Sequence, residues 1–69
     1  MYASMNFMTK SELRKAVQEQ RPVVLVSPTL GAVAVNGREY VEGPWQREKG
    51  RGWHAEVLCQ DARIVAVIS

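Results

Sequence analysis

The stretch WHAEVLCQDARIVAVI, residues 53–68 of a 69-residue chain, decides the fold. Apolar and polar side chains alternate from Trp53 to Cys59, which is the pattern of a strand with one buried face. The polar sequence Gln60-Asp61-Ala62 interrupts this pattern and predicts a turn. The chain is therefore expected to end in a β-hairpin. Its inner face is predicted to hold Trp53, Ala55, Val57, Cys59, Ile64, Ala66 and Ile68.

The other face of this hairpin is predicted to carry His54, Glu56 and Leu58. Because Val65 and Val67 are also apolar, the last strand is expected to be central in the sheet or covered on both faces. His54 and the lone Cys59 fall on opposite faces of one strand, so they cannot form a thiolate pair there. Cys59 is interpreted as a small buried hydrophobe and not as a nucleophile.

Two further strand signals precede the hairpin. The β-branched run at residues 23–26 predicts a strand that is buried on both faces. Residues 32–41 predict a tight hairpin, because Asn36-Gly37 supplies the two positive φ values of a type I′ turn. A two-residue turn would place Val33 opposite Tyr40 on one face of that hairpin.

A helix is predicted near the start of the chain. Thr9 and Glu12 form a capping box, in which the Thr9 hydroxyl accepts from the Glu12 amide and the Glu12 carboxylate reaches back to the Thr9 amide. Pro22 ends the helix by about Gln20. Residues 1–8 have no helical or strand period and are expected to be a frayed terminus. The helix is amphipathic, with a narrow apolar stripe of Leu13, Ala16 and Val17.

The chain therefore reads as α+β, with a short N-terminal helix followed by about five short antiparallel strands. We expect residues 9–69 to form a single helix-capped domain, either a small bent sheet or an SH3-like or Sm-like barrel. The order of elements and the chain length resemble the Sm-like fold, whose members assemble into RNA-binding rings. The bacterial Sm-like RNA chaperones carry a Tyr-Lys-His signature entering the last strand, where this chain has Gln60-Asp61-Ala62-Arg63. No functional residue is therefore carried over from that resemblance.

The composition excludes several classes of protein. With one cysteine and one histidine, the chain can form neither an intramolecular disulfide nor a Cys/His zinc site. An apolar fraction of 46% predicts a folded protein, and the apolar runs are too short for a membrane-spanning helix. We expect a cytoplasmic protein that is not an enzyme and has no metal or cofactor. A phage, a plasmid or a cellular operon would each suit a small basic protein of this kind.

The candidate binding residues surround a charged, glycine-rich stretch at positions 46–52. Trp45 and Trp53 bracket this stretch. Register assigns Trp53 to the core and leaves Trp45 as a surface candidate. Tryptophan, tyrosine and arginine are enriched at interface hot spots. The predicted partner-binding set is Trp45, Arg47, Lys49, Arg51 and Tyr40.

Two functions fit this set. We favour a small regulatory module that binds a protein partner through the aromatic and basic loop surface, because the net charge of only +2 gives little attraction for a polyanion. The alternative is weak single-stranded nucleic-acid binding, with bases stacked on Trp45 and phosphates held by the three cations.

Self-association is a third possibility, through the apolar stripe of the helix or the exposed edge of the strand at residues 23–26. It would bring several copies of the basic loop together.

Overall fold

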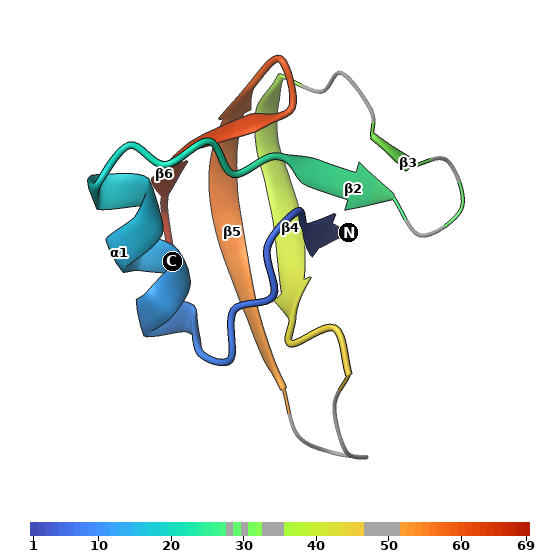
Figure 1. Cartoon of the computed structure of the whole chain (residues 1–69). Helices are drawn as coiled ribbons and strands as arrows, with labels where there is room; N and C mark the ends of the chain where they lie inside the picture. The colour runs from blue at the N-terminus through green and yellow to red at the C-terminus, as the bar shows by residue number, and fades with distance from the viewer. Residues whose placement is uncertain (28, 30, 33–35, 47–51) are drawn as a thin grey trace.

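The computed structural model describes residues 1–27, 29, 31–32, 36–46 and 52–69. In this part of the chain, one short helix packs against a bent six-stranded sheet (Figure 1). The protein is thus small and mostly β, with one short helix, as the sequence predicts. The elements in chain order are β1 (Tyr2–Ala3), α1 (Lys10–Gln18), β2 (Leu25–Ser27), β3 (Gly31–Ala32), β4 (Gly37–Gly43), β5 (Trp53–Gln60) and β6 (Arg63–Val67).

The strands follow the order β3-β2-β1-β4-β5-β6, so β3 and β6 are the edges of the described sheet. β1 and β4 run parallel, and every other neighbouring pair is antiparallel. One isolated bridge joins Val24, just before β2, to Arg63 at the start of β6. There the Ile64 N–H donates to the Val23 carbonyl oxygen at 2.8 Å. The sheet therefore bends until the chain just before β2 meets β6, but it remains open.

The helix forms where its end signals predict. Thr9 is the N-cap, and its Oγ1 accepts from the Glu12 N–H at 3.2 Å. The Glu12 carboxylate accepts from the Met8 N–H at 3.1 Å, one residue earlier than a capping box requires. Leu13 and Ala16 are buried. The predicted apolar stripe thus faces the sheet and docks α1 against β5 and β6.

The core lies between α1 and the inner face of the sheet. Leu13, Leu25 and Val57 are fully buried in it. Packing of this kind supplies most of the stability of a small domain, since no disulfide is available. The other buried members of this cluster are Ala3, Phe7, Ala16, Val23, Val41, Ala55, Cys59 and Ile64.

The N-terminus is ordered, contrary to the expectation of a frayed terminus. β1 lies between β2 and β4, with Tyr2 opposite Val26 on one side and Glu42 on the other. Ala3 and Phe7 are 3% and 7% exposed. A two-residue strand is too short to show a period in the sequence, so its long-range hydrogen bonds had no local signal.

Most of the first strand of the predicted hairpin over residues 32–41 lies outside the described part of the chain, which omits residues 33–35. Of the described residues, Ala32 pairs with Val26 of β2. β4 pairs along its whole length with β5, in a ladder of seven residue pairs that uses one edge of β4. Pairing of residues 33–35 with the other edge of β4 therefore stays a prediction.

The C-terminal hairpin forms with its turn where predicted, but its second strand is shifted. Asp61 and Ala62 adopt φ values of 52° and 70°, as a two-residue type I′ turn requires. A bulge between Leu58 and Cys59 then changes the register. Ile64 and Val67 consequently face the core, whereas Ala66 and Ile68, which were predicted to do so, do not.

β6 is also an edge strand of the described sheet, not the central strand that the sequence suggested. Val65 is 43% exposed and Ile68 is 42% exposed, so β6 is not covered on both faces. The bulge leaves Val65 without a partner in the ladder and places Ala66 opposite Leu58, so the apolar residues of β6 fall on both of its faces.

Candidate partner-binding surface

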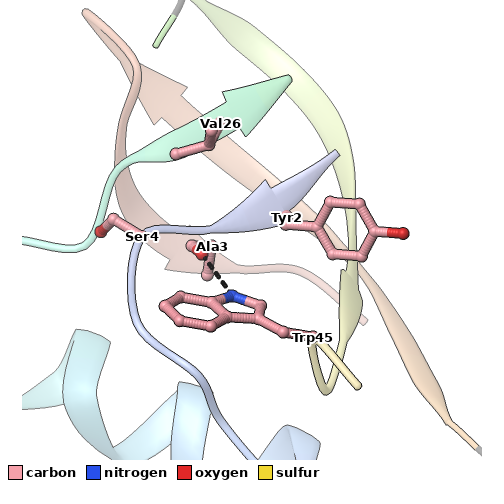
Figure 2. Close-up of a pocket in the computed structure, with 5 residues that line it drawn as sticks. All are labelled: Tyr2, Ala3, Ser4, Val26 and Trp45. Carbon is pink, nitrogen blue, oxygen red and sulfur yellow. Dashed lines mark hydrogen bonds between the residues drawn. The ribbon is translucent and has the colours of Figure 1, made fainter. Parts of the chain in front are cut away.

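Trp45 lies just beyond β4, where its ring is held at the surface. Its backbone N–H donates to Asn6 Oδ1 at 2.9 Å, and its indole Nε1 donates to the Ala3 carbonyl oxygen at 3.0 Å (Figure 2). The residue is nevertheless 52% exposed. A half-exposed aromatic ring is thus fixed in orientation by both of its N–H groups.

The Trp45 ring forms part of an open hollow of about 540 Å³. Figure 2 shows the indole beside β1, with the Tyr2 ring projecting near it and Val26 on the neighbouring strand. The Ser4 hydroxyl oxygen accepts from the Val24 N–H at 3.0 Å, so this polar group already has a partner. The hollow therefore offers mainly apolar and aromatic surface. Its lining residues are Tyr2, Ala3, Ser4, Val26 and Trp45.

The hollow continues onto the sheet face that points away from the helix. Glu42 lies opposite Tyr2 across the β1–β4 pair, and Tyr40 is two residues before Glu42 on the same strand. Side chains two apart on a strand share a face, so the two tyrosines lie on the same side of the sheet. Tyr40 is 65% exposed. Tyr40 therefore lies on the same face of the sheet as Tyr2, which lines the hollow together with Trp45.

The charges on this face are mixed. Arg38 Nη1 lies 3.8 Å from Glu56 Oε2, a solvent-exposed ion pair of small energy. Glu42 and His54 are cross-strand neighbours on the same face. The described part of the surface thus carries two carboxylates and one guanidinium. It has no excess of positive charge that would attract a polyanion.

The structure does not describe the three cations of the predicted binding set. Arg47, Lys49 and Arg51 lie outside the residues that the structure describes. Of the five predicted site residues, Trp45 and Tyr40 are therefore placed together on one surface, and the basic loop stays a prediction.

Trp53 has a different role from Trp45. It packs partly buried against the core, and its indole Nε1 donates to the Phe7 carbonyl oxygen at 3.0 Å. Its ring also lies against Gly43, where an added Cβ would fall 2.6 Å from Trp53 Cζ2. The prediction that Trp53 belongs to the core is confirmed.

The reactive side chains are not gathered into a catalytic arrangement in the described chain. Cys59 is buried, and burial, with a smaller contribution from the Glu39 carboxylate, raises the pKa of its thiol. A thiol held in its neutral form is a poor nucleophile. No group of three or more His, Cys, Asp or Glu residues in this part of the chain could hold a metal ion. Within the same residues, no helix is long and apolar enough to span a membrane.

Five residues of the surface were not identified from the sequence. Tyr2, Ala3, Ser4 and Val26 line the hollow, and Asn6 holds the Trp45 backbone. All but Val26 belong to the segment that was expected to fray. Two aromatic residues within the first seven positions were the only signal that this segment packs against something.

Comparison with known proteins assigns no family. No protein-family model, no curated protein and no solved structure matches the chain. Function is therefore inferred from the surface itself.

Proposed function

We propose that this protein is a small, non-enzymatic interaction module that binds a protein partner through the hollow beside Trp45. The observation that carries the proposal is that Trp45 is half exposed and yet fixed by two hydrogen bonds. Tyr2 and Val26 line the same hollow, and Tyr40 extends the surface along β4. Tryptophan and tyrosine are the residues that most often dominate binding energy at protein interfaces.

The fixed ring favours tight contact, because an aromatic anchor that is already oriented loses little conformational entropy on binding. Its hydrogen bonding also limits what the ring can offer. The indole N–H donates to the Ala3 carbonyl oxygen, so the exposed face of the ring is left for contact with a partner. An apolar or proline side chain from an extended peptide segment would match such a face.

The charges favour a protein over a nucleic acid. Single-stranded nucleic-acid sites combine stacking aromatics with a positively charged groove. Here Glu42 and Glu56 lie on the same face as Tyr40, and Arg38 is the guanidinium beside them. The nucleic-acid alternative depends on Arg47, Lys49 and Arg51. We also propose that the fold is of the small-barrel type, which the bridge between Val24 and Arg63 supports.

Affinity capture from the native cytoplasm tests the proposal with three immobilised proteins: wild type, Trp45→Ala and Met8→Ala. Met8 is a matched control, because it is 60% exposed but does not line the hollow. We expect the wild type and Met8→Ala to retain the same partner and Trp45→Ala to lose it. A loss of about 2 kcal/mol at a hot spot corresponds to roughly 30-fold weaker binding. Equal retention of that partner by Trp45→Ala would refute the proposed site, provided that circular dichroism shows the variant folded.

A further inference from the structure

We infer that the N-terminal segment Met1–Phe7 is a detachable wall of the hollow, so that docking of this segment switches the binding site on. The inference rests on the proposed function for its consequence, but not for its structural test. Three of the five lining residues, Tyr2, Ala3 and Ser4, belong to this segment. Without it, the hollow would lose more than half of its lining, and Trp45 would lose both of its hydrogen-bond acceptors.

The segment is held much as a bound peptide would be held. Its backbone is extended between β2 and β4, and the Glu42 N–H donates to the Met1 carbonyl oxygen at 2.9 Å. On the other side, the Ser4 N–H donates to the Val24 carbonyl oxygen at 2.8 Å. These two amide protons lie at the two edges of the docked segment, and each reports directly on its docking.

The indole groups of both tryptophans bind the backbone of this segment. Trp45 Nε1 donates to the Ala3 carbonyl oxygen and Trp53 Nε1 to the Phe7 carbonyl oxygen, both at 3.0 Å. A peptide that adds to a sheet is held by main-chain hydrogen bonds and by contacts to its side chains. The segment thus positions Trp45, and Trp45 holds the segment.

The backbone attachment of the segment is short. β1 contains only two residues, the buried apolar side chains of the segment are those of Ala3 and Phe7, and Met1 and Met5 are only partly buried against the core. Met8 and Thr9, which join it to α1, are exposed. Segments with few buried contacts open by local fluctuations at a lower free energy than global unfolding.

Partner binding and docking of the segment are thermodynamically linked. A partner in the hollow contacts Tyr2 and Ser4 only while the segment is docked, so binding stabilises docking and docking permits binding. Any interaction that withdraws Met1–Phe7 from the sheet would therefore disable the site.

Amide hydrogen exchange tests the coupling without a partner, in the wild type, Asn6→Ala and Trp45→Phe. Asn6→Ala removes the acceptor of the Trp45 backbone N–H, and Trp45→Phe keeps an aromatic ring but removes the indole donor. We expect the Ser4 and Glu42 amides to exchange at least about 10-fold faster in both variants, as expected when a hydrogen bond worth more than about 1.4 kcal/mol to docking is lost. The Ile64 amide, which donates to the Val23 carbonyl oxygen, is expected to keep its rate.

Leu58→Ala is the control variant, since Leu58 is 40% exposed and distant in the sheet order from β1. It is expected to leave the Ser4 and Glu42 rates close to those of the wild type. If these two amides exchange in step with Ile64 in every variant, the segment opens only with the whole protein and the inference is overturned. If Ser4 and Glu42 exchange faster in the two variants as expected, but Trp45→Ala still captures the partner, the proposed function is overturned and the inference about docking stands.

Discussion

Replacing Trp53 by alanine is expected to destabilise the protein more than replacing Trp45 by alanine. Trp53 packs against the core and donates its indole N–H to the Phe7 carbonyl oxygen. If the ring buries roughly 150 Å² of apolar area, loss of that burial costs about 4 kcal/mol at about 25 cal/mol per Å². The lost hydrogen bond adds about 1 kcal/mol. Trp45 is 52% exposed, so roughly 100 Å² is lost there, which costs about 2.5 kcal/mol, and the lost hydrogen bond to Ala3 brings the upper value to about 3.5 kcal/mol.

The assay is urea unfolding followed by far-ultraviolet circular dichroism, which reports mainly on the backbone. A domain of this size is stable by only a few kcal/mol, so Trp53→Ala is expected to be largely unfolded in buffer. Trp53→Phe then supplies the measurable value. It keeps most of the ring but loses the hydrogen bond to Phe7, for an expected cost of about 1–2 kcal/mol. Equal loss of stability in Trp45→Ala and Trp53→Ala would refute the division into a core tryptophan and a surface tryptophan.

Three further outcomes are expected from the same unfolding assay. Gly43→Ala should cost about 1–3 kcal/mol, because the new Cβ would overlap the Trp53 ring, and the cost should shrink in a Trp53→Leu background. Thr9→Ala should cost about 1 kcal/mol by removing the N-cap acceptor, and no change would contradict the cap. Burial and Glu39 raise the pKa of Cys59, so the unfolded thiol ionises first. Stability should therefore be complete below a pH of about 8.5 and fall as the pH rises through the folded pKa. A Cys59→Ala variant with the same loss at high pH would exclude this cause.

The nucleic-acid alternative has its own test, which needs no partner. A fluorescent single-stranded oligonucleotide titrated at low and at physiological salt is expected to show no site-specific binding. The opposite result would be binding at low salt that weakens steeply with added salt and is lost in Trp45→Ala. In that case the proposal of a protein partner is wrong and the basic loop is the functional surface.

The elements that the sequence predicts correctly are those specified by neighbouring residues. The Thr9 cap and the apolar stripe of α1 lie within a few residues of one another. The alternation along β5 and the turn at Asp61 and Ala62 are also local. In each case, the side-chain pattern needs one buried face and nothing from a distant part of the chain.

The elements that the sequence misplaces depend on distant partners. β1 exists because its backbone completes β2 and β4, and neither strand is near it in sequence. The bulge at Leu58 and Cys59 shifts β6 by one residue, and a shift of one exchanges the two faces of a strand. Alternation in one strand cannot reveal such a shift, because it does not specify the partner's register.

Only part of the candidate site could be predicted from the sequence, because the rest depends on segments that are distant along the chain. Trp45 and Tyr40 were identified by residue type, since exposed aromatics are informative wherever they occur. Tyr2, Ser4 and Val26 were missed, because the hollow joins segments that are far apart along the chain. The hydrogen bond from Trp45 to Ala3 alone spans 42 positions.

The two tryptophans are related to each other in a way that their sequence positions did not suggest. They bracket a charged stretch, but their indole N–H groups both point to the N-terminal segment, at Ala3 and at Phe7. Trp53 donates from a position against the core, and Trp45 donates from the surface. The two rings therefore differ in burial, although each donates the same kind of hydrogen bond. The surface ring is the one whose loss can be tolerated by the fold, and it is therefore the one that can contribute to binding. Holding the N-terminal segment and presenting Trp45 are thus one structural event, which is why amide exchange at Ser4 and Glu42 reports on the state of the site.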